Sequence, residues 1–178
     1  MSPWLSRLTR LGRALEAVSE WSGRAVSWLA LALVLLVSYD VGMRYLFNRG
    51  SVGLQELEWH LFALLFLLGA AYALRHDAHV RVDVLHHRMS REQRALVDLI
   101  GGLIVLLPVC ALIVYSSWPF VHNAFVYGEG SPDPGGLPHR FLLKAAIPAG
   151  FLLLALQGVA DIIRNLAVVL GADRGVRR

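Results

Sequence analysis

The chain has 178 residues, 56% of them hydrophobic and only 17% charged, with a formal net charge of +4. Soluble domains carry about 25% charged residues, so this composition favours an all-α membrane protein over a soluble domain. At about 20 residues per membrane-spanning helix, the length leaves room for four spans in a single membrane domain, residues 1–178. The basic residues lie beside the apolar segments, so we expect an anionic lipid bilayer, and not nucleic acid, as their partner.

The first segment, residues 3–22, repeats apolar side chains at steps of three and four, with arginines and glutamates between them. This pattern predicts an amphipathic helix with a basic polar face, of the kind that lies on an anionic membrane surface. A frayed N-terminal tail is the alternative interpretation.

The first predicted span, residues 25–47, carries two charged side chains near its end. Asp40 and Arg44 are four residues apart and therefore share a helix face, with the acid N-terminal to the base. Charges at this depth are costly unless they are paired or face protein. Two interpretations stay open: an internal Asp40–Arg44 pair, or a contact with another helix or subunit.

The second predicted span, residues 54–76, follows a short turn that contains glycines. Glu56 and His60 lie four residues apart near its start. Further along, Gly69 and Ala73 form a pair of small residues at the same spacing, which would let another helix backbone come close.

The short turn brings the polar side chains of these two spans near one another. Asp40 and Arg44 lie just before the turn, and Glu56 and His60 lie just after it. We expect the four side chains to form one polar cluster that fixes the angle between the two helices.

The connection at residues 77–94 is polar and rich in histidine. His79 and Asp83 alternate there with valines, which is typical of a short extended segment. Histidine and aspartate can bind metal ions, but this connection is basic and would repel a dication, so we expect a solvated loop. Ser90 and Gln93 have the spacing of a capping box and predict that a helix starts there.

The third predicted span, residues 95–120, contains a proline near its middle. Pro108 should kink the helix, because proline has no backbone N–H and its ring clashes with the preceding turn. Residues 121–140 follow as a loop whose core, rich in proline and glycine, should be tightly turned.

The fourth predicted span, residues 141–169, carries two pairs of small residues at helical spacing. Ala145 lies four residues before Ala149, and Ala146 lies four residues before Gly150. Each pair would let a neighbouring helix approach closely.

The basic residues are distributed unevenly between the two sides of the predicted bundle. Of the 17 lysines and arginines, 13 lie near the two termini or in or just before the 77–94 connection, and four lie on the other side. Because cytoplasmic segments carry the excess of basic residues, we expect both termini and this connection to be cytoplasmic.

The sequence contains no Walker loop, no H-E-x-x-H zinc motif and no G-x-S-x-G nucleophile motif. We therefore expect no enzyme, and no catalytic, metal or cofactor residue. Ionisable residues lie at the ends of the predicted spans, whereas an ion pathway would want some at mid-depth. The chain is thus expected to support a transport pathway and not to form one. One alternative stays open, in which His60 and His122 hold a haem in a membrane anchor subunit of a redox complex.

A series of short motifs follows in order along the chain. They are Arg44-Tyr45, Asn48, Leu54-Gln55-Glu56-Leu57, Trp59, Phe66-Leu67-Leu68-Gly69-Ala70-Ala71, Arg75 and His79-Val80-Arg81-Val82-Asp83, then Gly136-Leu137-Pro138, Lys144, Ile147-Pro148 and Leu156-Gln157-Gly158. In this order and spacing the series resembles the small permease subunit of tripartite ATP-independent periplasmic (TRAP) transporters, the DctQ-type family, over roughly residues 25–165. Members commonly carry a tryptophan and two adjacent acids before the second span; here Leu54 and Gln55 replace the first of these, and Glu56 keeps the second acid.

The resemblance implies a four-helix protein of the bacterial inner membrane that pairs with a large permease subunit (DctM-type). That subunit would hold the substrate and sodium sites, and a periplasmic binding protein (DctP-type) would deliver a small organic acid. It implies no catalytic, metal or cofactor residue here. The candidate structural or partner-contact residues are Asp40, Arg44, Glu56, His60, Gly69, Ala73, Arg75, His79, Asp83, Ala145 and Ala149.

Overall fold

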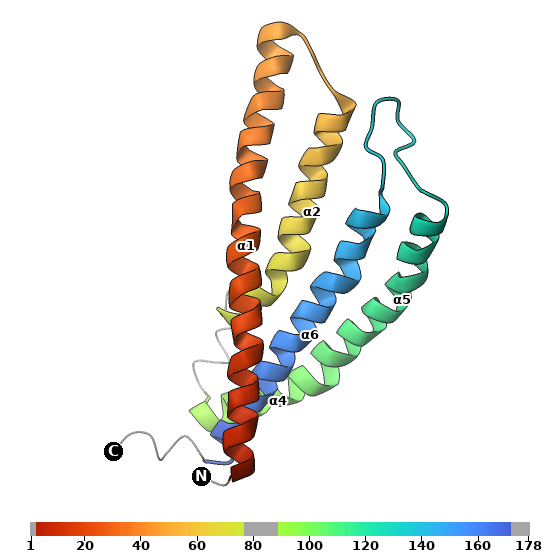
Figure 1. Cartoon of the computed structure of the whole chain (residues 1–178). Coiled ribbons are helices and arrows are strands. Elements are labelled where there is room, and N and C mark those ends of the chain that lie inside the picture. Colours follow the sequence, from red (N-terminus) through yellow and green to blue (C-terminus); the bar gives the residue numbers. More distant parts are fainter. Residues whose placement is uncertain (1–2, 77–88, 172–178) are drawn as a thin grey trace.

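The computed structural model describes residues 3–76 and 89–171, and these form a bundle of helices with short connections (Figure 1). The elements are α1 (Pro3–Phe47), α2 (Val52–Arg75), α4 (Arg91–Gly101), η1 (Gly102–Leu106, a π-helix), α5 (Leu107–Val126) and α6 (Phe141–Val169). Helix α1 begins and α6 ends at the same end of the bundle, the lower end in Figure 1. The opposite end, which holds the loop between α5 and α6, is the upper end.

The predicted class, an all-α membrane protein with four spans, is confirmed. Within the described ranges, four helical stretches are long and apolar enough to cross a membrane: α1, α2, the continuous run α4–η1–α5, and α6. Large apolar side chains face outward on every one of them; Tyr45 and Tyr115, for example, are about four-fifths exposed. An outer surface this apolar suits lipid and would be a liability in water.

Helix α1 is continuous across the predicted join between the amphipathic segment and the first span. Its 45 residues, at about 1.5 Å per residue, run about twice the ~30 Å thickness of a bilayer core. Gly23, near the join, does not break the helix. A Cβ there would lie 2.2 Å from the ring of Tyr72 on α2, so the glycine makes room for that ring. A separate N-terminal helix lying on the membrane surface is not confirmed.

The third span is interrupted at the predicted proline, and it is longer than predicted. The N–H of Leu107 donates to the carbonyl of Gly102, five residues back, so a π-helical turn directly precedes Pro108. Such wide turns are a common way for a helix to accommodate a disturbance in its hydrogen bonding. At the far end α5 continues to Val126, so the loop before α6 is shorter than the predicted 121–140.

The start of α4 confirms the predicted capping box. The Ser90 hydroxyl accepts a hydrogen bond from the N–H of Gln93 at 3.3 Å, and the Gln93 side chain accepts one from the N–H of Ser90 at 2.9 Å. Two of the N–H groups that a helix start leaves unpaired are satisfied in this way.

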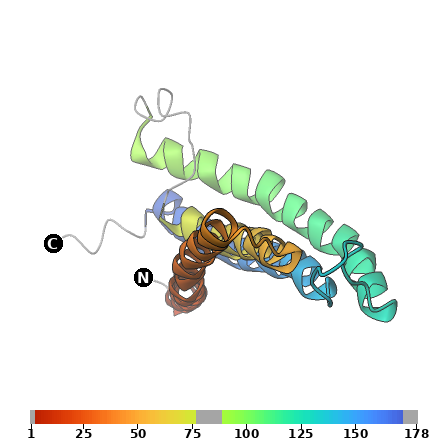
Figure 2. The same ribbon diagram turned by 90° about the horizontal axis from the view of Figure 1, so that it is seen from above.

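Helix α6 is the centre of the bundle and packs against α1, α2, α4 and α5 (Figures 1 and 2). Seen from above, the run α4–η1–α5 lies along one side of α6, and α1 lies on the other (Figure 2). A Cβ on Gly150 would lie 2.6 Å from the carbonyl oxygen of Leu67 on α2, and one on Gly158 would lie 2.6 Å from a methyl group of Leu106 in η1. Small residues therefore let two neighbours approach α6 closely, as is usual between membrane helices.

The contact at Gly150 predicts that even one added methyl group will destabilise the fold. Gly150→Ala should lower the free energy of unfolding in detergent by about 1–3 kcal/mol, because the methyl group meets a backbone oxygen that cannot move alone. Gly101→Ala is the matched control, since a Cβ there has open space, and it should stabilise the helix by about 0.5–1 kcal/mol. Denaturation followed by circular dichroism gives both values; equal effects would contradict the packing role of Gly150.

The charge distribution predicts that the lower end faces the cytoplasm. In a Cys110→Ala background, a cysteine at Pro134 in the upper loop should react in intact cells with a membrane-impermeant thiol reagent. A cysteine at Arg7 on α1 should react only after the membrane is opened. Both positions are exposed, so accessibility of the side chain does not limit either reaction. The reverse pattern of labelling would overturn the orientation.

Candidate functional site

The carboxylate of Glu56 is the centre of a polar junction at the upper end, which we call the upper junction. One oxygen, Oε1, accepts hydrogen bonds from Ser131 Oγ at 2.5 Å and from Arg140 Nη2 at 3.0 Å. The other, Oε2, accepts one from the backbone N–H of Leu137 at 2.6 Å. Only 4% of Glu56 is exposed. The first turn of α2 is thereby fastened to the loop between α5 and α6.

The backbone of this loop is shaped to fit around the Glu56 carboxylate. A Cβ on Gly136 would lie 2.3 Å from Ser131 Oγ and 2.8 Å from Glu56 Oε2, so only glycine fits there. Gly135 and His139 have positive φ angles of 82° and 63°, which turn the chain back on itself. The predicted tight turn is confirmed, and it directs the Ser131 hydroxyl and the Leu137 N–H at the Glu56 carboxylate.

Two cations at the start of α6 hold the same loop. Lys144 forms an ion pair with Glu129, and its Nζ lies 3.8 Å from the centre of the Phe120 ring. The guanidinium carbon of Arg140 lies 5.7 Å from the centre of the Trp59 ring on α2. Cations over aromatic faces are attracted by the ring quadrupole, so these contacts add to the fastening of the upper end.

The expected single cluster of Asp40, Arg44, Glu56 and His60 is wrong. Asp40 pairs internally with Arg44, whose Nη2 lies 2.5 Å from Asp40 Oδ2. Glu56 instead binds the α5–α6 loop, and His60 Nδ1 donates to the backbone carbonyl of Glu56 at 2.5 Å. Within the described ranges, no hydrogen bond or ion pair joins the two groups. The loop offers three donors in fixed positions, and a single arginine on a neighbouring helix could not match them.

The Asp40–Arg44 pair leaves one carboxylate oxygen unused. Asp40 is 2% exposed, and its Oδ1 has no hydrogen-bond partner in the described part of the chain. The Arg44 side chain is nearly half exposed. The pair is thus internal, and its arginine remains available on the outer surface of α1.

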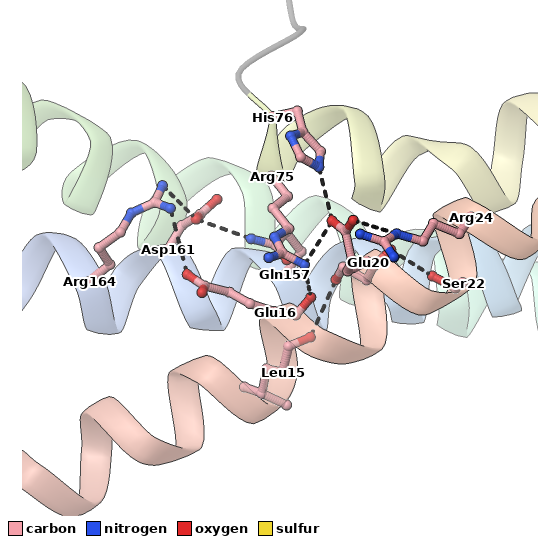
Figure 3. Close-up of polar contacts among 11 residues, drawn as sticks. Leu15, Glu16, Glu20, Ser22, Arg24, Arg75, His76, Gln157, Asp161 and Arg164 are labelled. Atoms are coloured by element: carbon pink, nitrogen blue, oxygen red, sulfur yellow. Dashed lines mark hydrogen bonds and ion pairs between the residues drawn. The ribbon is translucent and has the colours of Figure 1, made fainter. Parts of the chain in front are cut away.

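A second polar junction, which we call the lower junction, ties α1 to α2 (Figure 3). The Glu20 carboxylate lies 3.1 Å from Nη1 of Arg75, the last residue of α2, and 3.0 Å from Nε2 of His76, which follows it. It also lies 2.8 Å from Arg24 Nε on its own helix. Arg75 Nη1 also donates to the backbone carbonyl of Glu16 at 2.5 Å. Arg75, a predicted partner-contact residue, is therefore used within the chain.

The lower junction continues from α1 to α6 (Figure 3). Arg164 lies 3.6 Å from the Glu16 carboxylate and 2.8 Å from that of Asp161. Asp161 Oδ1 also accepts a hydrogen bond from Gln157 Nε2 at 3.2 Å, and Gln157 is fully buried. The sequence pattern places Glu16 and Glu20 on the polar face of an amphipathic helix and does not predict their contacts with α2 and α6. Their four-residue spacing on one face was the signal that α1 carries an acidic contact strip.

The predicted small-residue pairs differ in what they contact. A Cβ on Gly69 would lie 3.9 Å from Val26 of α1, so Gly69 faces a helix of the same chain. Ala73 and Ala145 are half-buried, whereas Ala149 is exposed. On α6 the pair that packs inside is Ala146 with Gly150, both buried. Of the four pair residues named as candidates, Ala149 is the one left open to a partner.

The part of the histidine-rich connection that holds the candidates His79 and Asp83, residues 77–88, lies outside the described residues. The connection is shorter than the predicted 77–94, because α4 begins at Arg91. Among the residues that are described, no group of three or more histidine, cysteine, aspartate or glutamate side chains could hold a metal ion. The haem alternative that His60 and His122 left open has no support.

The upper junction predicts strong coupling between Glu56 and Arg140. In a double-mutant cycle of Glu56→Gln, Arg140→Gln and both together, the coupling energy for unfolding should be about 1–3 kcal/mol, because the two side chains share a buried contact. Asp133→Asn, an exposed change in the same loop, is the control and should have little effect. Additive single effects would show that the two residues act independently.

Comparison with known proteins finds several relatives. Residues 33–168 match the family described as tripartite ATP-independent periplasmic transporters, DctQ component. The chain is 33% identical over 132 residues, 74% of this chain and 78% of the relative, to a protein of Haemophilus influenzae assigned as a TRAP transporter small permease protein. It is 26% identical over 172 residues (85% and 72%) to the C4-dicarboxylate TRAP transporter small permease protein DctQ of Vibrio cholerae. It is also 26% identical over 143 residues (78% and 72%) to the ectoine TRAP transporter small permease protein TeaB of Halomonas elongata.

Proposed function

We infer the role of this chain from its family, since the chain belongs to the DctQ components of the tripartite ATP-independent periplasmic transporters. It is a multi-pass membrane protein and a small permease subunit of such a transporter. Its role is to brace a large permease subunit (DctM-type), and the sites for the transported solute lie in that partner.

The placement of ionisable residues along the spans supports this role. Four stretches contain no aspartate, glutamate, lysine, arginine or histidine: residues 25–39, 61–74, 99–121 and 145–160. Pathways for ions and charged solutes through a membrane use ionisable groups at mid-depth. Among the described residues, the polar contacts that join one helix to another are concentrated instead in the two junctions at the ends of the bundle.

The open face of α6 is the docking surface for the large subunit in this proposal. Leu142, Ala149, Leu152 and Leu156 are exposed there, at steps of seven, three and four residues that keep them on one side of the helix. Membrane helices associate through close packing around small residues, because lipid tails are as apolar as leucine. Ala149 supplies the small residue in the middle of this stripe.

The remaining features of the transport system are proposed by analogy with the family. A periplasmic binding protein (DctP-type) delivers the solute, the large subunit takes it up by sodium-coupled symport, and the complex sits in the inner membrane with both termini of this chain in the cytoplasm. Relatives are named for C4-dicarboxylates and for ectoine. We propose a small organic acid as the class of solute that this system transports. The orientation, with both termini in the cytoplasm, is supported by the excess of basic residues at the lower end.

The docking surface predicts which substitution separates the two permease subunits. Ala149→Leu should greatly reduce co-purification with the large subunit and abolish solute uptake in whole cells, because the longer side chain prevents close approach. Ala111→Leu is the matched control: this alanine is exposed on α5, away from the proposed surface, and its substitution should leave both measurements unchanged. The fold of each variant is checked by its melting curve.

Two results would contradict the role of a brace. Full co-purification of Ala149→Leu with the large subunit would place the contact elsewhere. Uptake at the normal rate by the large subunit and binding protein, in cells that lack this chain, would show that no brace is required.

A further inference from the structure

A cavity of about 750 Å³ opens at the lower end of the bundle, beside the lower junction, whose Glu16 and Arg164 line part of it. It lies between the N-terminal part of α1, the helix α4 and the C-terminal part of α6. Helices α1 and α4 each pack on α6 but do not pack closely on each other, and the space left between them is the cavity. Its size is in the range of sites that hold small ligands, about 300–1,000 Å³.

The polar wall of the cavity is basic. It contains four arginines (Arg13, Arg91, Arg94, Arg164) and two acids (Glu16, Asp98). The Arg164 guanidinium is engaged by Glu16 and Asp161 in the lower junction. By contrast, Arg13 makes no hydrogen bond or ion pair with the described residues, and Arg94 uses its Nε to donate to the Met89 carbonyl at 3.1 Å. Positive charge therefore remains on both sides of the opening, on α1 and on α4.

The other wall of the cavity is apolar. Ala95 of α4 and Ala160, Ile163, Ala167 and Val168 of α6 line it. The apolar wall continues directly into the spans, because residues 99–121 and 145–160 carry no ionisable side chain. The cavity thus joins a cationic mouth to an apolar interior at the level where the spans end.

We propose that this cavity binds an anionic phospholipid, with the phosphate between Arg13 and Arg94 and an acyl chain along the alanine-rich wall. Basic pockets between helices at a membrane boundary select such headgroups. A free phosphate would satisfy the arginines but would leave the apolar wall uncovered, whereas a lipid satisfies both. The bound lipid fills the gap between α1 and α4 and fixes the third span to the first.

The test measures lipid retention by the full chain in mild detergent with native mass spectrometry. The probes are phosphatidylglycerol and phosphatidylcholine with identical acyl chains. Phosphatidylglycerol should be retained in preference. Arg13→Gln/Arg94→Gln should weaken its binding about 25-fold, because each cation beside an anionic headgroup contributes about fivefold. Ala167→Trp, which fills the cavity without changing charge, should also weaken it, and this variant decides the matter if the double arginine variant does not fold.

The matched control is Arg7→Gln/Arg10→Gln, which removes the same charge from exposed positions of α1 that do not line the cavity. It should bind phosphatidylglycerol as the parent does. An equal loss in this control would reduce the effect to general attraction between a basic surface and lipid. Unchanged binding by the cavity variants, or equal retention of phosphatidylglycerol and phosphatidylcholine, would overturn the proposal.

Discussion

The close approach of α6 to the backbone of α2 at Gly150 is the contact on which the arrangement of the other helices depends. Between helices in lipid there is no hydrophobic driving force of the kind that folds soluble proteins, so packing must come from backbones that approach closely. Gly150 permits this toward Leu67 on one side of α6, and Gly158 permits it toward Leu106 on the other. With α6 fixed in the middle, α1 completes one side of the bundle and α5 the other.

Polar contacts then fix the ends of the helices and leave the middle apolar. At the upper end the Glu56 carboxylate gathers donors from the α5–α6 loop, and at the lower end Glu20 gathers Arg75 and His76. Removing one partner of a buried ion pair leaves an uncompensated charge, so the buried Glu56 carboxylate of the upper junction depends on its donors staying in place. A frame that is fixed at both ends and carries no ionisable side chain in its middle suits the proposed role of a brace.

The sequence predicted four spans and the capping box at Ser90, and it offered the internal Asp40–Arg44 pair as one of two interpretations, because each of these features depends on residues that lie close together in the chain. It did not reveal that Glu56 binds Ser131 and Arg140, which lie 75 and 84 residues further along the chain. Nor did it distinguish which small-residue pair of α6 packs inside. Adjacent residues differ by about 100° around a helix, and only the position of α2 decides between them.

The π-helical turn η1 sets the phase of the third span. Below the turn, Ala95 is buried, and Gly102, seven residues later, faces Ile162 of α6. Above it, Cys110, Ser117 and Ala124 are buried at the same interval of seven. The step between the two series, from Gly102 to Cys110, is eight residues.

The wide turn η1 accommodates the one extra residue, so α5 keeps its buried side chains directed at α6. Elsewhere in the span, an insertion or deletion of a single residue would rotate every later side chain by about 100° about the helix axis and carry the buried series away from α6. The length of this span can therefore change by one residue at η1. The lengths of α4 and α5 on either side of it are fixed, because their buried residues must face α6.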